Sequence, residues 1–173
     1  MKRIGLISDT HSCWDDRYGK YFSGCDEIWH AGDIGCYEIA GRLNGIAPLR
    51  AVCGNCDGAD IRSYYRETNR FQIEDADILL KHIGGTPGHY DPSIRMQLSM
   101  STPSLFVCGH SHILKVQYDT TLGMLYINPG AAGLQGWQKV RTLVRFTIDG
   151  SKFRDLEVIE LERDDSSIHI LNR

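Results

Sequence analysis

The first 53 residues alternate short β-branched segments with stretches of helical spacing. Three segments have the composition of strands: Arg3–Ser8, Asp26–His30 and Leu49–Cys53. Between them, Trp14–Phe22 and Cys36–Asn44 carry apolar residues at helical intervals. Strands and helices that alternate in this order favour parallel neighbours, with the helices packed on the sheet. This part of the chain therefore predicts a parallel sheet covered by helices.

Residues 71–108 continue with strand-like segments that lie closer together. Phe71–Glu74 and Ile78–His82 flank a turn around Asp75, and Leu105–Cys108 is a further strand. Ser93–Met100 predicts a helix, because it opens directly after Pro92. We expect the first two of these strands to be neighbours in one sheet.

The last strand-like segments are separated by turn residues and predict an antiparallel meander: Leu114–Tyr118, Met124–Ile127, Thr142–Ile148 and Leu156–Leu161. Together with the first half, this pattern predicts two mixed sheets packed face to face with helices outside them, an α/β (α+β) fold. A length of 173 residues corresponds to about one domain. We expect that domain to cover residues 1–161, with Glu162–Arg173 as a polar tail that is an edge segment or partly disordered.

Composition excludes several function classes. Lys+Arg 19 against Asp+Glu 22 gives a net charge of −3, without the basic excess of proteins that coat nucleic acid. No apolar run approaches the roughly 18 residues that a membrane span needs. We therefore expect a cytoplasmic protein that binds neither a membrane nor duplex nucleic acid. There, six cysteines should be mostly reduced thiols.

Polar residues of one chemical kind follow the strand-like segments. Seven of them lie directly after five different strands: Asp9, His11, Asp33, Asn55, His82, His110 and His112. Because ligands bind outside the carboxyl ends of strands in α/β sheets, these side chains are expected to meet at one edge. Oxygen and imidazole donors in this number can hold two cations. They favour Mn²⁺, Fe²⁺, Zn²⁺, Ni²⁺ or Co²⁺, with Mg²⁺ weaker at the imidazole-rich positions.

Each residue also has an ordinary structural interpretation. Asp9 and Asp33 could be helix N-caps, Asn55 could belong to a turn, and His82 alone could be a core or surface residue. His169 is expected to be a tail residue without a role. Cys53 and Cys56 form a C-x-x-C pair, which in other proteins serves redox chemistry or half of a zinc site. The absence of a second pair from the sequence weakens both of those readings.

The ordered motifs resemble a known family. D-x-H at Asp9, G-D at Asp33, G-N-x-D at Asn55, a lone His82 and G-H-x-H at His110 resemble the calcineurin-like metallophosphoesterases, in particular their small bacterial and archaeal phosphodiesterase branch. The resemblance spans residues 1–161. It implies a four-layer α-β-β-α sandwich and a binuclear metal centre, with Mn²⁺ as the first expectation for both ions.

The resemblance also implies roles for the seven residues. One metal would take Asp9, His11 and His112, the other Asn55, His82 and His110, with Asp33 bridging them. The implied activity is hydrolysis of phosphodiesters, with phosphomonoesters left open, by a hydroxide held between the metals. Asp9, Asp33, Asn55 and His82 would therefore be catalytic through the metals.

Three positions depart from the family pattern. Cys56 stands where larger relatives place a protonating His, so protonation of the leaving group is unassigned and Cys56 is hypothesised to be dispensable. His82 is followed by an unfamiliar segment, Gly84–Tyr90, as a candidate substrate loop. Ala131 stands where relatives often have Ser.

Further candidates support the seven or contact substrate. His30 is expected to be a buried supporting residue, and Asp57 either orients a ligand or bonds within its own turn. His89 is a substrate candidate or a solvated loop residue. Arg95 is the single Arg between His82 and Cys108, where Lys is absent. This scarcity of cations favours a monoanionic diester over a dianionic monoester.

The expected partner is thus a small phosphoester, which could be nucleotide-like. The main alternative function is a protein-binding scaffold on the same fold, like the retromer subunit. A metal-storage or sensing protein would use the same residues without turnover. Exposed edges of a meander sheet leave a homodimer open.

Overall fold

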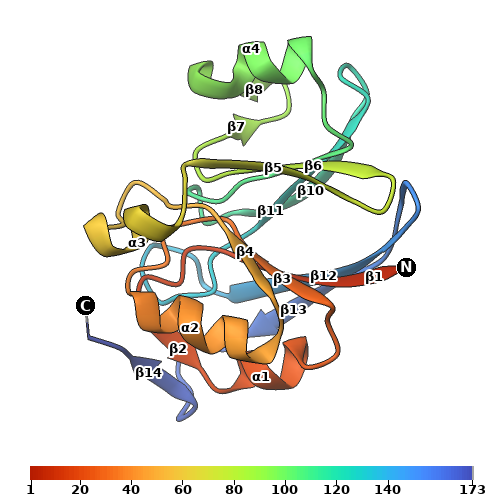
Figure 1. The fold of residues 1–173 in the computed structure, drawn as a ribbon. Coiled ribbons are helices and arrows are strands. Elements are labelled where there is room, and N and C mark those ends of the chain that lie inside the picture. Colours follow the sequence, from red (N-terminus) through yellow and green to blue (C-terminus); the bar gives the residue numbers. More distant parts are fainter. Residues whose placement is uncertain (173) are drawn as a thin grey trace.

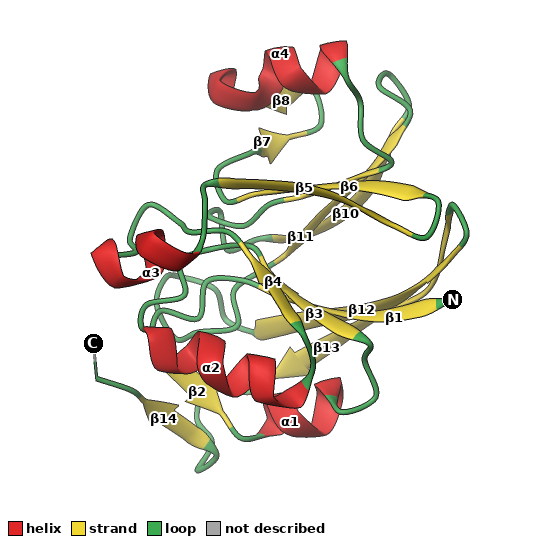
Figure 2. Ribbon diagram, viewed as in Figure 1, coloured by secondary structure: helices red, strands yellow, loops and turns green. Residues whose placement is uncertain are grey.

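The structure, a computed structural model, describes residues 1–172 and contains two five-stranded mixed sheets (Figures 1 and 2). The first sheet runs, in spatial order, through β13 (Lys152–Leu161), β12 (Arg141–Asp149), β1 (Lys2–Ile7), β3 (Glu27–His30) and β4 (Leu49–Ala51). The second runs through β10 (Leu114–Asp119), β11 (Met124–Pro129), β9 (Leu105–Val107), β6 (Ala76–Lys81) and β5 (Thr68–Ile73). In each sheet three neighbouring strands are parallel, β1-β3-β4 and β11-β9-β6.

Helices cover the outer faces of both sheets (Figure 2). On the first sheet lie α1 (Arg17–Phe22) and α2 (Tyr37–Ile46), and on the second lies α4 (Pro92–Met100). A short α3 (Ala59–Tyr64) lies at the side where loops from both sheets gather. Two small ribbons complete the fold: β2 (Cys13–Asp15) with β14 (Ile168–Ile170), and β7 (Gly85–Thr86) with β8 (His89–Tyr90). Among the described residues, none of the helices has the length and apolarity that a bilayer crossing requires.

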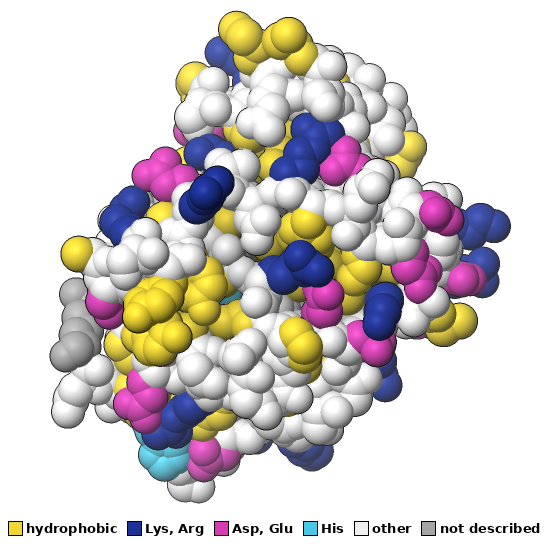
Figure 3. Space-filling view, in the orientation of Figure 1, with side chains coloured by type: hydrophobic (Ala, Val, Ile, Leu, Met, Phe, Trp, Pro, Cys, Tyr) yellow, Lys and Arg dark blue, Asp and Glu magenta, His cyan; other side chains and the backbone are white. Residues whose placement is uncertain are grey.

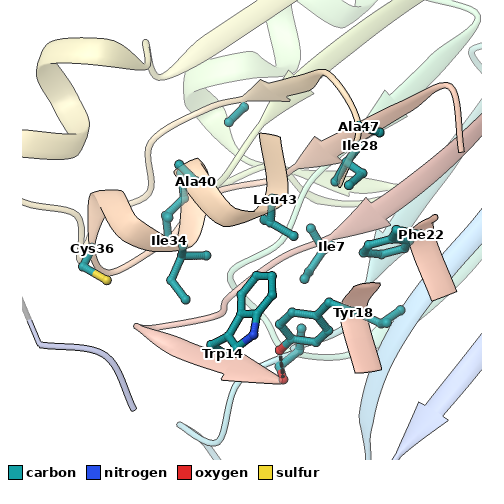
Figure 4. Close-up of a cluster of buried hydrophobic side chains, with 14 of the residues drawn as sticks. Ile7, Trp14, Tyr18, Phe22, Ile28, Ile34, Cys36, Ala40, Leu43 and Ala47 are labelled. Carbon is teal, nitrogen blue, oxygen red and sulfur yellow. Dashed lines mark hydrogen bonds between the residues drawn. The ribbon is translucent and has the colours of Figure 1, made fainter. Parts of the chain in front are cut away.

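Three apolar clusters fill the spaces between the four layers. Tyr18, Leu43 and their neighbours lie between the first sheet and its helices (Figure 4). Leu6, Trp29 and Val144 lie between the two sheets, and Phe106 lies with its neighbours under α4. Strands buried on both faces explain the nearly continuous apolar runs in the sequence. The expected α-β-β-α sandwich of two mixed sheets is confirmed.

The predicted meander is wrong. Of the four strands expected to form it, β10 and β11 pair as a hairpin in the second sheet, whereas β12 crosses to the first sheet and pairs antiparallel with β1. There Ile4 lies opposite Phe146, and β13 follows as the outer strand. Alternating hydrophobicity shows that a segment is a strand but leaves open which of two available edges it joins.

Some boundaries also differ from the sequence-based expectation. Trp14 belongs to β2, so the first helix is shorter than expected, and α3 was not foreseen. The polar tail returns as an edge strand: Ile170 of β14 lies opposite Cys13 of β2. Arg173, the last residue of that tail, lies outside the described residues.

Candidate metal centre

The carboxyl ends of five strands from both sheets meet at one edge. Asp9 and His11 follow β1, Asp33 follows β3, and Asn55 follows β4. From the second sheet, His82 follows β6, while His110 and His112 follow β9. Contacts across the edge join the two sheets: His82 Nε2 lies 3.1 Å from Asp33 Oδ2, and His112 Nε2 lies 3.1 Å from Asp9 Oδ1. The structure thus brings residues of both sheets together, as expected from their positions after strands.

Six of the seven residues form two groups of three. In each group, the potential ligand atoms lie within 4.8 Å of one another: Asp9, His11 and His112 in one, and Asp33, His82 and His110 in the other. Asn55 is exposed and lines a hollow that His82 also lines. A third group joins His11 and Asp33 to the thiol of Cys56, which places this cysteine nearer to the centre than sequence reasoning expected.

Each carboxylate has one oxygen held by the protein and one directed at the histidines. Asp9 Oδ2 accepts hydrogen bonds from the Ser8 hydroxyl at 2.6 Å and from the His110 N–H at 3.1 Å. Asp33 Oδ1 accepts one from the Cys56 N–H at 2.8 Å. The other oxygens, Asp9 Oδ1 and Asp33 Oδ2, each lie 3.8 Å from His11 Nε2. The two carboxylates are therefore oriented before any ligand binds.

Hydrogen bonds also set the tautomers of two histidines. His82 Nδ1 lies 2.7 Å from the carbonyl oxygen of Ala31, and His112 Nδ1 lies 3.2 Å from Gln138 Oε1. Because both partners accept, each Nδ1 must donate its proton, which leaves a lone pair on Nε2. This is the arrangement in which metal-binding histidines are held in proteins.

Three buried polar atoms at the centre have no hydrogen-bond partner among residues 1–172: Asp9 Oδ1, His11 Nε2 and His82 Nε2. A buried polar atom without a partner costs about 1–3 kcal/mol, and a charged one costs more. A cation coordinated by these atoms would remove that cost. The donors are oxygens and imidazole nitrogens, a set that fits divalent transition metals.

Electrostatics keep the centre anionic. Burial alone would raise the pKa of Asp33, but the neighbouring imidazoles of His82 and His11 and the hydrogen bond from the Cys56 N–H lower this pKa overall. Burial lowers the pKa of His11, so that its imidazole is held neutral. The centre thus presents the ionised carboxylate of Asp33 beside the neutral imidazole of His11, an arrangement that suits a cation.

The backbone at this edge is bent in an unusual way. Five of the seven residues have a positive φ: Asp9 (53°), His11 (46°), Asp33 (55°), His110 (67°) and His112 (59°). Left-handed backbone is uncommon outside glycine and concentrates at functional sites. At Gly54, a Cβ would lie 2.0 Å from Asp33 Oδ1, so only glycine admits the carboxylate this closely.

Two supporting candidates have defined partners. His30 is fully buried, which lowers its pKa to about 3. Its Nδ1 accepts from the Gly32 N–H, and its Nε2 bonds the Thr10 hydroxyl at 2.9 Å, so it supports the D-x-H loop. Asp57 accepts from the N–H groups of Gly54 and Gly35, both at 2.8 Å. Asp57 therefore both bonds within its own turn and joins that turn to the loop after Asp33.

The two substrate candidates lie elsewhere. Arg95 lines a separate hollow with Tyr90 and Asp119 beneath α4. His89 is exposed on β8, where it pairs with Thr86. The segment 84–90 forms a small hairpin, and Tyr126 anchors it by donating to the Gly85 carbonyl at 2.7 Å.

Sequence reasoning missed two residues that act on the site from elsewhere in the chain. Gln138 bonds His112, and Arg62 donates to the carbonyls of Gly54 at 2.7 Å and Asp57 at 2.9 Å. Arg62 is thereby hydrogen-bonded to both ends of the turn that carries Asn55. Neither residue stands in a motif, and Arg62 lies on α3, for which the sequence offered no clear period.

Comparisons with known proteins identify the family of this chain. The model of the calcineurin-like phosphoesterase superfamily domain matches residues 1–151. A probable metallophosphoesterase of Methanothermobacter thermautotrophicus is 30% identical over 168 residues, covering 90% of this chain and 91% of that protein.

Solved structures show the same fold at lower identity. Vps29 from Entamoeba histolytica, complexed with Zn²⁺, has a TM-score of 0.71 at 16% identity, covering 94% of this chain and 99% of that chain. An archaeal phosphodiesterase has a TM-score of 0.66 at 20% identity, covering 92% and 99%. At these identities the similarity shows a shared fold. Because one fold can host different functions, it does not determine the activity of this chain.

Proposed function

The chain belongs to the calcineurin-like phosphoesterase superfamily, and from that premise we propose that it is a metal-dependent phosphodiesterase acting on a small phosphoester. The observation that carries the proposal is the set of unpartnered buried atoms, Asp9 Oδ1, His11 Nε2 and His82 Nε2, at a centre of converging donors. Bound cations would give these atoms partners, and a hydrolase of this family depends on such cations.

The two groups of donors would each hold one divalent cation, with Mn²⁺ the first to test. Asp9, His11 and His112 would take one ion, Asn55, His82 and His110 the other, and Asp33 would lie between them. When bound, such a pair of ions lowers the pKa of a shared water and neutralises the phosphoryl oxygens during in-line displacement.

The chain's own residues orient and hold this centre. Hydrogen bonds from Ser8 and the His110 N–H leave one oxygen of Asp9 free to bind, and the Cys56 N–H does the same for Asp33. Ala31 and Gln138 hold the protons on Nδ1 of His82 and His112. Such preorganisation means that little rearrangement is needed when substrate arrives.

Charges in the adjoining hollow support a diester. A hollow of about 260 Å³ is lined by Asn55 and His82 together with two cationic residues, Arg62 and Lys81, and two anionic residues, Glu67 and Asp91. Arg62 is paired with Glu67 at 3.1 Å. The two positive and two negative charges balance. The hollow therefore has no excess of positive charge to neutralise the second negative charge that a phosphomonoester carries and a diester lacks.

The test is hydrolysis of bis-p-nitrophenyl phosphate and p-nitrophenyl phosphate by protein stripped with chelator and reloaded with Mn²⁺. We expect turnover of the diester that requires metal, exceeds turnover of the monoester and is lost in His110→Ala. His169→Ala is the matched control, since His169, on β14, is an exposed histidine paired with Asp16. Diester turnover that persists without metal or in His110→Ala contradicts the proposal.

A protein-binding scaffold is the alternative. Exposed apolar side chains favour it: Met96 and Met100 of α4 are 72% and 80% exposed, on a face where hydrophobic side chains gather (Figure 3). No turnover of either ester by protein that demonstrably holds two metals would shift the assignment to this alternative.

A further inference from the structure

A second hollow adjoins the centre. It has a volume of about 510 Å³, and the residues that line it include His110, His112, Ile113 and Trp137. The side chain of Ile113 is 67% exposed, and Trp137 is fully exposed. An apolar wall thus stands directly beside two of the proposed metal ligands.

The loop that carries Trp137 is tied to His112. Gln138 Oε1 accepts from His112 Nδ1 at 3.2 Å, and its amide donates to the carbonyl of Gly133 at 3.3 Å. Gly136 has a φ of 103°, and a Cβ there would lie 2.3 Å from His112 Nδ1. The residues on both sides of Trp137 therefore pack against the imidazole.

A third attachment comes from the C-terminal part of the chain. Arg163 donates one hydrogen bond to the Gln138 carbonyl at 2.7 Å and another to the carbonyl of Leu134. The loop is thus held from two sides, while the indole at its tip is left without cover.

An uncovered indole here is unlike the other tryptophans of the chain. Trp29 is completely buried and Trp14 is 7% exposed. A tryptophan buries up to about 250 Å² and adds stacking energy when it meets a ring, so an exposed one forgoes a large contact. Flat rings of any sequence stack on such a side chain, whether from a nucleobase or an aryl group.

We propose that Trp137 and Ile113 form a subsite for a planar ring joined to the phosphate that the metal centre receives. This inference rests on the proposed function and specifies its substrate class: phosphoesters that carry an aromatic ring, from either a nucleoside or an aryl alcohol. The phosphate lies at the histidines, and the ring stacks on the indole on the outer side of His112.

The test measures binding of three phosphates that differ only beyond the ester oxygen. Adenosine 5′-monophosphate and phenyl phosphate carry rings of the two candidate sources, and ribose 5-phosphate carries none. Calorimetry with Mn²⁺-loaded protein is expected to show about tenfold tighter binding of a ring-bearing phosphate, a difference of about 1.4 kcal/mol. The better of the two ring ligands identifies the source.

Variants connect this preference to the indole. The ring preference is the affinity for the ring-bearing phosphate divided by the affinity for ribose 5-phosphate. Trp137→Ala is expected to reduce this ratio from about 10 to about 1, and Trp137→Phe should retain most of it. Tyr118→Ala is the matched control, because Tyr118 is also an exposed aromatic residue (60%) but lies near the turn of the β10–β11 hairpin. As an independent readout, the ring ligands should quench the fluorescence of an exposed tryptophan in the wild type and not in Trp137→Phe.

Three results would overturn the inference. The wild type could bind all three phosphates equally, or Trp137→Ala could keep the full ring preference. Alternatively, the wild type could be a dimer that Trp137→Ala dissociates, with ring preference unchanged, which would assign the indole to contact between copies. Since none of these measurements requires turnover, loss of hydrolysis with an intact ring preference would contradict the proposed function alone.

Discussion

Arg141 and Asp15 form an ion pair, with Arg141 Nη1 at 2.8 Å from Asp15 Oδ2, in which both side chains are completely buried. The pair links β12 to β2. The same guanidinium donates to the carbonyl of Ala132 at 2.6 Å and to the Tyr18 hydroxyl at 3.1 Å. Ala132 in turn donates its N–H to the Ser8 carbonyl, next to Asp9. The pair thus supports the loop that borders the metal centre.

Removal of the arginine should destabilise the whole domain. Arg141→Met removes the buried positive charge from Asp15 and one donor from the Ala132 carbonyl, which keep Arg17 and the Tyr18 hydroxyl, respectively, as donors. Breaking a comparable buried pair costs about 3–5 kcal/mol. Urea denaturation should show this loss. Arg154→Met is the control, since Arg154 forms an exposed pair with Asp149 and should lose under about 1 kcal/mol. Equal losses in the two variants would contradict the assigned role.

Asp15 gives one pH dependence a definite sign. Burial alone would raise the pKa of this carboxyl, but hydrogen bonds from Arg17 and Arg141 lower it overall. Because the pKa of Asp15 is lower in the folded state, the ionised carboxylate stabilises the fold at pH values above its unfolded-state pKa of about 3.9. This stabilisation is lost as the pH falls through the pKa of the folded state. Urea midpoints should therefore fall more steeply with acidification in the wild type than in Asp15→Asn. A steeper fall in Asp15→Asn would refute this sign.

Metal should stabilise the fold as well as act in catalysis. Because the unpartnered buried atoms of the centre come together only in the folded chain, a cation at about 100 times its Kd would add about 2.7 kcal/mol of stability at each site. For a chain of this size, such a gain raises Tm by about 5–10 °C. Chelator should reverse the shift in a thermal scan. In His110→Ala, the metal-free Tm should stay close to that of the wild type while the shift shrinks.

Arg62 should control the position of Asn55. Its guanidinium holds the carbonyls of Gly54 and Asp57, so Arg62→Met frees the turn between them. Loss of such a supporting contact typically costs about 10–100-fold in metal affinity or activity. Metal titration of the variant measures the effect. Arg66→Met, a nearby exposed arginine, is the charge-matched control and should bind metal as the wild type does.

Cys56 should contribute through its backbone rather than through its thiol. Its N–H donates to Asp33 Oδ1, an interaction that Cys56→Ala retains, and its side chain is exposed. We expect less than a tenfold loss of kcat on an activated diester such as bis-p-nitrophenyl phosphate. Removal of a true general acid costs about 10²–10⁴-fold, so a loss beyond about a hundredfold would show that the thiol takes part.

Positions after strands made much of the centre predictable. Asp9, Asp33 and His82 all follow apolar segments, and the carboxyl ends of parallel strands must meet at one edge. Their convergence, and the four layers around it, therefore follow from the order of elements along the chain. Whether these residues bind metal stays a prediction that the titrations above decide.

Other features depend on contacts that a linear pattern does not contain. Arg62 and Gln138 are ordinary surface residue types, and only folding brings them beside Gly54 and His112. The placement of β12 beside β1 was missed because either sheet offered it an edge. Arg95 was chosen for its charge alone, and its helix carries it to a different hollow.

The convergence of two sheets also determines when the centre can exist during folding. Asp9 Oδ2 and the His110 N–H meet across 101 positions of sequence, and contacts that distant form slowly because a long loop must close first. An unfolded chain offers a metal only the local D-x-H and H-x-H pairs. Ions present from the start of refolding should therefore change the folding rate little. We expect them to act on the unfolding rate instead: ions bound between the docked sheets would hold the sheets together and lengthen the lifetime of the folded molecule.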